Sequence, residues 1–204
     1  MVVVGIVGRI AAGKSTAARL LAARGAEVID ADRIAHEVLD EPGVRREIAD
    51  RFGPGVCDAE GRVLRPPLAT EVFGPTAAHD AALADLEAIV HPRVRRQIEE
   101  RLAALRKHSA ADKTVVVLDV PLLMQAHWDD LCDWLLLVEC PEDERRRRLD
   151  ARGWPVEQRA ARERAWNRGY RSPPPEKTLF IEASGDEAYT LEQVSRIWDS
   201  LRRV

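Results

Sequence analysis

Short apolar runs alternate with longer amphipathic stretches along this chain, and the alternation predicts strands separated by helices. Each apolar run has the length of a buried strand, and the runs lie at 2–7, 27–29, 114–118, 134–138 and 179–181. Stretches with helical character lie at 15–24, 33–39, 44–52, 68–106, 142–152, 156–168 and 191–201. This order predicts an α/β fold, in which a parallel sheet is flanked by helices and ligands bind at the carboxyl ends of the strands.

The block 41–112 departs from the alternation because it contains no convincing strand. Residues 53–67 are rich in glycine and proline and predict a loop. The helical stretch that follows is expected to break at His91-Pro92, since proline fits the first turn of a new helix. We therefore expect a helical insertion in a core built from the flanking parts of the chain.

Residues 8–15 match the phosphate-binding P-loop pattern G-x-x-x-x-G-K-[ST], between a predicted strand and a helix that stops near Gly25. In such a loop, backbone N–H groups and the helix N-terminus hold phosphate oxygens. Lys14 would reach the β- and γ-phosphates, and the Ser15 hydroxyl would ligate Mg²⁺. The residues expected to bind ATP are Gly8, Arg9, Ile10, Ala11, Ala12, Gly13, Lys14, Ser15 and Thr16.

Aspartates follow two of the predicted strands. Asp119 ends the run at 114–118 and is a candidate partner of Mg²⁺, although it could instead cap the following turn. Asp30 and Asp32 end the second strand and would point the same way along an extended segment. One of them could act as a base toward a hydroxyl acceptor, and one could cap the next helix.

Arginines are concentrated in the helix predicted at 142–152. Most of them are expected on a solvated face, paired with neighbouring acidic residues. Arg148 and Arg152 lie four positions apart, and we expect one or both to stabilise a transferring phosphoryl group. His91, with Arg95 nearby, could contact an anionic acceptor, although a lone histidine is more often structural.

Composition narrows the class of protein. The chain has 204 residues, 46% of them apolar, and a formal net charge of −3, so no basic field favours nucleic acid. Three scattered cysteines predict reduced thiols, as in a cytoplasmic protein, and no signal peptide or membrane span is visible. The five tryptophans show no regular spacing and are expected in the core or at interfaces. We expect a monomer or a weak homo-oligomer.

Taken together, the motifs resemble one family, dephospho-CoA kinase. The resemblance covers residues 2 to about 185 and rests on a P-loop, an Asp-Ala-Asp segment, a His-Pro pair, a Val-Pro-Leu-Leu segment and an R-L-x-x-R helix. These motifs read here as 8–15, Asp30-Ala31-Asp32, His91-Pro92, Val120-Pro121-Leu122-Leu123 and 148–152.

The resemblance implies transfer of the ATP γ-phosphate to the ribose 3′-hydroxyl of dephospho-CoA, giving CoA and ADP, with Mg²⁺ as cofactor at Ser15 and Asp119. It implies that Asp32 is the general base, that Lys14 and a lid arginine (Arg148 or Arg152) neutralise the phosphoryl group, and that Asp32, His91 and Arg95 bind the acceptor. It also implies a single P-loop kinase unit, with a nucleotide-kinase-like core (1–40, 113–140 and 170–204), a helical acceptor-binding insertion (41–112) and a helical lid (141–169).

Several positions depart from the family pattern. Arg9, Ala11 and Ala12 stand where Gly, Gly and Ser are usual, so Arg9 adds a cation near the phosphates and Ala11 is strained if its φ is positive. Gln125 replaces a usual glutamate and Asn167 a usual glutamine. Ala183 stands at a usual asparagine, in a segment (177–185) that matches the family poorly, so adenine recognition is expected to differ.

Two other functions stay open at this point. One is another nucleoside or nucleotide kinase of the same fold, against which the Asp-x-Asp segment and His91-Pro92 argue. The other is a non-catalytic ATP-binding protein, against which the retained Asp32 argues, because binding alone needs no base.

Overall fold

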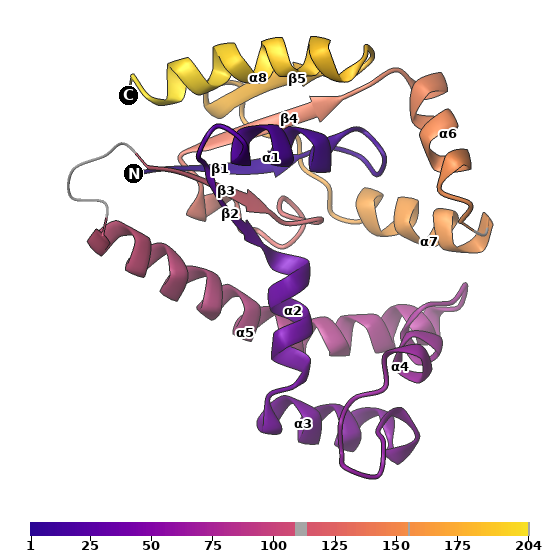
Figure 1. The fold of residues 1–204 in the computed structure, drawn as a ribbon. Coiled ribbons are helices and arrows are strands. Elements are labelled where there is room, and N and C mark those ends of the chain that lie inside the picture. Colours follow the sequence, from indigo (N-terminus) through magenta and orange to yellow (C-terminus); the bar gives the residue numbers. More distant parts are fainter. Residues whose placement is uncertain (109–113, 155, 204) are drawn as a thin grey trace. The chain divides into compact units, whose positions relative to one another are not determined.

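A parallel five-stranded sheet forms the core of the computed structural model, which describes residues 1–108, 114–154 and 156–203 (Figure 1). The strands are β1 (Val2–Val7), β2 (Glu27–Asp30), β3 (Val115–Asp119), β4 (Trp134–Glu139) and β5 (Thr178–Glu182). They lie in the order β2-β3-β1-β4-β5, and every neighbouring pair is parallel. The α/β class and all five strands predicted from the apolar runs are thereby confirmed.

Four helices accompany the sheet in the first of two compact units, which comprises residues 1–30 and 102–204. They are α1 (Lys14–Ala22), α6 (Glu142–Ala151), α7 (Val156–Asn167) and α8 (Glu187–Leu201), with short 3₁₀ turns at Asp129–Leu131 and Pro175–Lys177. Apolar side chains of α1 and α8 share one buried cluster with the strands. Helix α1 ends as predicted, since Gly25 (φ 101°) donates its N–H to the carbonyl of Ala22, 2.9 Å away.

The second unit, residues 31–101, is helical. It contains α2 (Ala31–Leu39), α3 (Pro42–Phe52), a 3₁₀ turn (Pro54–Val56), α4 (Arg65–Val72) and most of α5 (Ala77–His108). Within the described part of 41–112, the one strand-like feature is an isolated bridge between Cys57 and Val63. The insertion predicted from the sequence began at residue 41, whereas this unit also includes α2. Residues 109–112 of the predicted insertion lie outside the described residues.

The predicted break at His91-Pro92 is wrong, because α5 is one helix of 32 residues with Pro92 inside it. Proline removes one backbone donor from the helix. Beside the proline, the Arg93 guanidinium donates to the carbonyl of Ile89 at 2.6 Å. Apolar side chains on both sides of Pro92, at 90, 94 and 98, are buried and anchor both halves. Neither α5 nor any other described helix is long and apolar enough to cross a membrane.

Candidate active site

The phosphate-binding loop leaves β1 at Val7 and runs straight into α1. A Cβ on Gly8 would lie 2.4 Å from the carbonyl oxygen of Val138, so β4 leaves no room for a side chain. Gly13 has φ 115°. Ala11 has φ 63°, which confirms the strain expected when alanine replaces the usual glycine, at a cost of about 1 kcal/mol. The loop therefore has the backbone geometry that close approach of phosphate oxygens requires.

Lys14 folds back over this loop. Its Nζ donates to the carbonyl oxygens of Gly8 at 2.7 Å and Arg9 at 3.1 Å. It also lies 5.9 Å from the centre of the Trp166 ring, within reach of a cation–π interaction. The ammonium group is thus held at the loop, where a phosphate oxygen could take the place of either carbonyl.

Beside the loop is a pocket of about 370 Å³. Its walls come from the loop, the end of β4, α6 and the chain at the end of α7, and they comprise Gly8, Arg9, Ala12, Leu137, Val138, Glu139, Cys140, Glu142, Arg145, Trp166 and Tyr170. The rings of Trp166 and Tyr170 lie 4.7 Å apart, and burial raises the pKa of the Tyr170 hydroxyl. No spacing in the sequence predicts this aromatic pair, because the five tryptophans are irregularly placed and none is marked as lying near the loop.

The two arginines singled out in the sequence have different surroundings. The Arg148 guanidinium donates to the carbonyls of Ala12 at 3.2 Å and Ala183 at 2.7 Å, and it pairs with Glu144. It therefore joins the loop to the chain after β5. Arg152 follows the end of α6, is exposed, and lies 5.1 Å from the ring centre of Trp154.

A third arginine of α6, Arg145, was expected on the surface, and this prediction is wrong. Its side chain is only 7% exposed and donates to both carboxylate oxygens of Glu142 and to Glu163. These hydrogen bonds hold the pKa of Glu142 down to about 2. Helical spacing could have predicted that Arg145 lies near the site, because it is three positions before Arg148 and shares its face of the helix.

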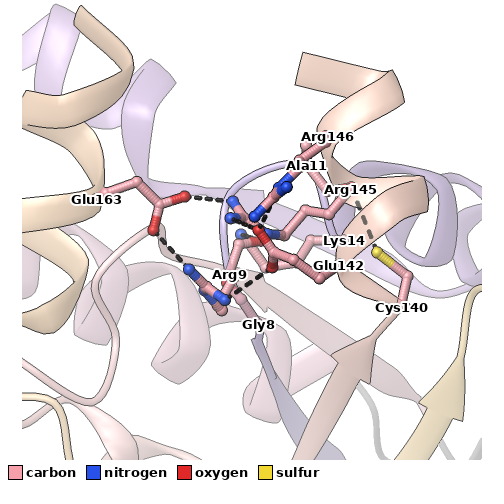
Figure 2. A network of polar contacts seen from close by, with 9 residues as sticks. All are labelled: Gly8, Arg9, Ala11, Lys14, Cys140, Glu142, Arg145, Arg146 and Glu163. Carbon is pink, nitrogen blue, oxygen red and sulfur yellow. Dashed lines mark hydrogen bonds and ion pairs between the residues drawn. The ribbon is translucent and has the colours of Figure 1, made fainter. Parts of the chain in front are cut away.

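Arg9 completes a ring of charges with these three residues, as Figure 2 shows. It donates to Glu142 at 3.1 Å and to Glu163 at 2.9 Å, so each carboxylate binds both Arg9 and Arg145. Glu142 also pairs with the exposed Arg146 at 3.5 Å. We call Arg9, Glu142, Arg145 and Glu163 the charge ring. The extra cation that the sequence predicts near the phosphates is therefore present but offset by two carboxylates.

The aspartates that follow the strands take up distinct positions. Asp30 and Asp119 are register partners at the carboxyl ends of β2 and β3. Asp32 does not continue the extended segment as expected, because α2 begins at Ala31 and places Asp32 in its first turn, in the other unit. A carboxylate is stabilised there by the helix dipole. The predicted pair pointing the same way is thus replaced by one strand-end and one helical carboxylate.

A divalent ion would find oxygen ligands in the first unit. Ser15 is the second residue of α1 and Asp119 ends β3. Among the described residues there is no cluster of three or more His, Cys, Asp or Glu able to hold a metal alone. Hydroxyl and carboxylate oxygens in small number fit Mg²⁺, which keeps water ligands and takes further oxygens from a nucleotide.

His91 and Arg95, the remaining predicted acceptor residues, lie four positions apart on α5 in the helical unit, which also contains Asp32. Burial lowers the pKa of His91, opposed by the nearby charge of Glu87. Arg95 pairs with Glu99 at 2.8 Å. All three predicted acceptor residues therefore belong to one unit, and the P-loop belongs to the other.

Comparison with known proteins gives a consistent result. Residues 2–166 match the family model described as dephospho-CoA kinase. A dephospho-CoA kinase of Thermobifida fusca is 41% identical over the whole chain and 98% of its own length, and one of Moorella thermoacetica is 36% identical over the whole chain and 93% of its length. The solved structure of TT1252 from Thermus thermophilus superposes with a TM-score of 0.74 at 33% identity, covering 98% of this chain and 96% of its own.

Proposed function

The chain belongs to the dephospho-CoA kinase family of phosphotransferases, and we propose that its own residues transfer the γ-phosphate of ATP to the ribose 3′-hydroxyl of dephospho-CoA. The observation that carries the proposal is the loop at 8–13, whose backbone conformation, close contact with β4 and adjacent Lys14 suit a bound triphosphate. The identity of the acceptor, dephospho-CoA, is supported by membership of the family.

At the phosphoryl group, the protein mainly positions and neutralises charge, because phosphoryl transfer needs little covalent work from side chains. Lys14 binds the β- and γ-phosphates. Ser15 and Asp119 would hold Mg²⁺, which when bound offsets charge on the phosphates. Arg148 keeps the loop in shape through Ala12, and either it or Arg152 meets the transferring group.

At the acceptor, Asp32 accepts the proton of the 3′-hydroxyl as that oxygen attacks the γ-phosphorus. His91 and Arg95 bind the anionic acceptor, within a helical insertion at 41–112. The lid at 141–169 covers the reacting groups, and the remaining segments form the nucleotide core. These assignments rest on the family resemblance together with the chemistry of each side chain.

We also propose a cytoplasmic location and a monomer or weak homo-oligomer that binds no nucleic acid. The location is supported by the free thiols of Cys57, Cys132 and Cys140.

The test is release of ADP from MgATP with and without dephospho-CoA, for the wild type, Asp32→Asn and a control, Asp50→Asn. Asp50 is an exposed carboxylate on α3 of the same unit. We expect ADP release that depends on dephospho-CoA, lowered about 10²–10⁴-fold in Asp32→Asn and unchanged in the control. Near-normal kcat in Asp32→Asn would rule out its role as base. ATP binding without acceptor-dependent ADP would favour a non-catalytic protein, and stimulation by nucleosides alone would favour a nucleoside kinase.

A further inference from the structure

Two departures from the family pattern converge on the same helix. Arg9, at a position where glycine is usual, donates to Glu163 of α7 at 2.9 Å. Gln125, where glutamate is usual, donates its Nε2 amide to the carbonyl of Trp166 on α7 at 2.6 Å. A glutamate carboxylate could not donate that hydrogen bond, and glycine has no side chain to reach Glu163. Both replacements therefore add an attachment for α7.

Helix α7 carries groups that face the phosphate-binding loop. Trp166 lines the pocket beside the loop and lies 5.9 Å from the ammonium group of Lys14. Glu163 also accepts a hydrogen bond from the buried Arg145, which lines the same pocket. A shift of α7 would therefore move one wall of the pocket and remove one partner of Arg145.

The charge ring argues against Arg9 acting directly as a phosphate ligand. Its four residues are two guanidinium groups and two carboxylates with a formal charge of zero, and both carboxylates already bind Arg9 (Figure 2). Outside the ring, the exposed Arg146 adds a further ion pair to Glu142 at 3.5 Å. Arg9 is 45% exposed, whereas Arg145 is 7% exposed. Arg9 thus links the loop to α7 through its ion pair with Glu163.

We propose that Arg9 and Gln125 are positioning residues of the phosphoryl transfer, which hold α7 against the phosphate-binding loop through Glu163 and the carbonyl of Trp166. The inference rests on the proposed kinase activity. In this proposal the position of α7 determines how completely water is excluded at the loop. Loss of either attachment therefore lowers kcat more than it lowers the affinity for ATP.

A double-mutant cycle tests the Arg9–Glu163 ion pair, using Arg9→Ala, Glu163→Gln and the double variant. The chain offers a matched control, because Arg171 and Asp129 also pair at 2.9 Å, with side-chain exposures of 47% and 23% against 45% and 22% for Arg9 and Glu163. Neither control residue lines the pocket. The control cycle uses Arg171→Ala, Asp129→Asn and their double variant.

We expect Arg9→Ala and Glu163→Gln each to lower kcat about tenfold, with the dissociation constant of ATP changed less than about threefold, and the double variant to be no worse than either single one. The control cycle is expected to leave kcat unchanged. Gln125→Glu, which breaks the other attachment, is expected to lower kcat in the same way. If the charge-ring variants fold poorly, Gln125→Glu still tests whether the attachment of α7 affects kcat.

Additive effects in the cycle would overturn the proposal, as would a kcat loss in Arg9→Ala with Glu163→Gln silent, because Arg9 would then act on the nucleotide itself. Unchanged kcat in all variants would also overturn it.

A second readout does not depend on turnover. Acrylamide quenching of Trp166, taken as the difference from the Trp166→Phe background, should increase in Arg9→Ala, Glu163→Gln and Gln125→Glu. If the wild type shows no acceptor-dependent ADP release, the proposed activity fails, and this quenching still decides whether the two residues hold α7. Unchanged quenching would refute the attachment even in an active kinase.

Discussion

Gly8 is the position where the structure predicts the sharpest consequence of adding one methyl group. A Cβ on Gly8 would lie 2.4 Å from the carbonyl oxygen of Val138, and real Cβ contacts do not fall below 3.0 Å. Both partners are backbone, and they follow a register that pairs Val7 with Leu137. Neither atom can rotate away, so Gly8→Ala has to push the start of the phosphate-binding loop away from β4.

The expected loss of stability in Gly8→Ala is the sum of two costs, overpacking against β4 and backbone strain. Overpacking of a tight site costs about 1–3 kcal/mol, and a non-glycine residue at unfavourable positive φ costs about 1–2 kcal/mol. We therefore expect Gly8→Ala to lower the free energy of unfolding by about 2–5 kcal/mol, which for a chain of this size is a Tm loss of about 5–20 °C.

Two further glycines provide matched controls. Gly25 also has positive φ (101°) but nothing within 4 Å of its Cβ position, so Gly25→Ala measures the strain alone, at about 1 kcal/mol. Gly43 lies in α3 with open space around it, so Gly43→Ala should be neutral or stabilising by up to about 1 kcal/mol.

The assay is thermal unfolding followed by circular dichroism, together with ATP binding by calorimetry. Because Gly8 lines the pocket, Gly8→Ala is expected to weaken ATP binding by at least about tenfold, or 1.4 kcal/mol, whereas Gly25→Ala and Gly43→Ala leave it unchanged. If Gly8→Ala melts at the same temperature as Gly25→Ala, the contact with β4 costs nothing and the reasoning is refuted.

Three other predictions concern single side chains. Lys14→Ala should lower kcat/KM by about 30–1000-fold (2–4 kcal/mol), measured by ADP release, and a loss below about tenfold would count against its contact with the transferred group. Arg148→Ala should raise the ATP dissociation constant about tenfold, and Arg148→Lys should not restore it, because a single ammonium cannot reproduce the planar fork that binds Ala12 and Ala183; full recovery by lysine would contradict this. Burial raises the pKa of Cys132 to about 12 from an ordinary value of 9, so the unfolded chain loses this proton first as pH rises. The free energy of unfolding should fall by up to about 1.4 kcal/mol per pH unit above pH 9, and Cys132→Ala should flatten that slope in denaturant titrations at pH 8–11; equal slopes would contradict the burial argument.

The sheet could be predicted from the sequence because a buried parallel strand leaves a local signature, a run of apolar residues bounded by turn residues. The P-loop is also local, since its glycines, Lys14 and the flanking elements are contiguous. Even the strain at Ala11 could be anticipated, because it depends only on the backbone that the motif requires.

Other features depend on contacts that local patterns do not contain. Pro92 is a reliable sign of a helix boundary in isolation, but buried side chains on both sides of it keep α5 continuous. The predicted direction of Asp32 rests on an extended segment, whereas α2 starts at Ala31, two residues before the helix predicted at 33–39. Helix boundaries are set by the whole first turn, so a shift of one or two residues reverses the direction of a side chain.

The charge ring could not be predicted because the sequence does not show that β1 pairs with β4. Arg9 and Glu142 are 133 positions apart, and Glu163 is 21 positions further along, so on its own helix each acidic residue reads as part of a solvated face. Once β1 is known to pair with β4, Val7 at the end of β1 lies beside Leu137, and β4 continues only to Glu139, so the segments that follow the two strands leave the same edge of the sheet. Arg9 comes two residues after Val7 and Glu142 five after Leu137, which brings the two charges together. An arginine in the P-loop is then an attachment for α6 and α7, and its effect on phosphate binding depends on those helices.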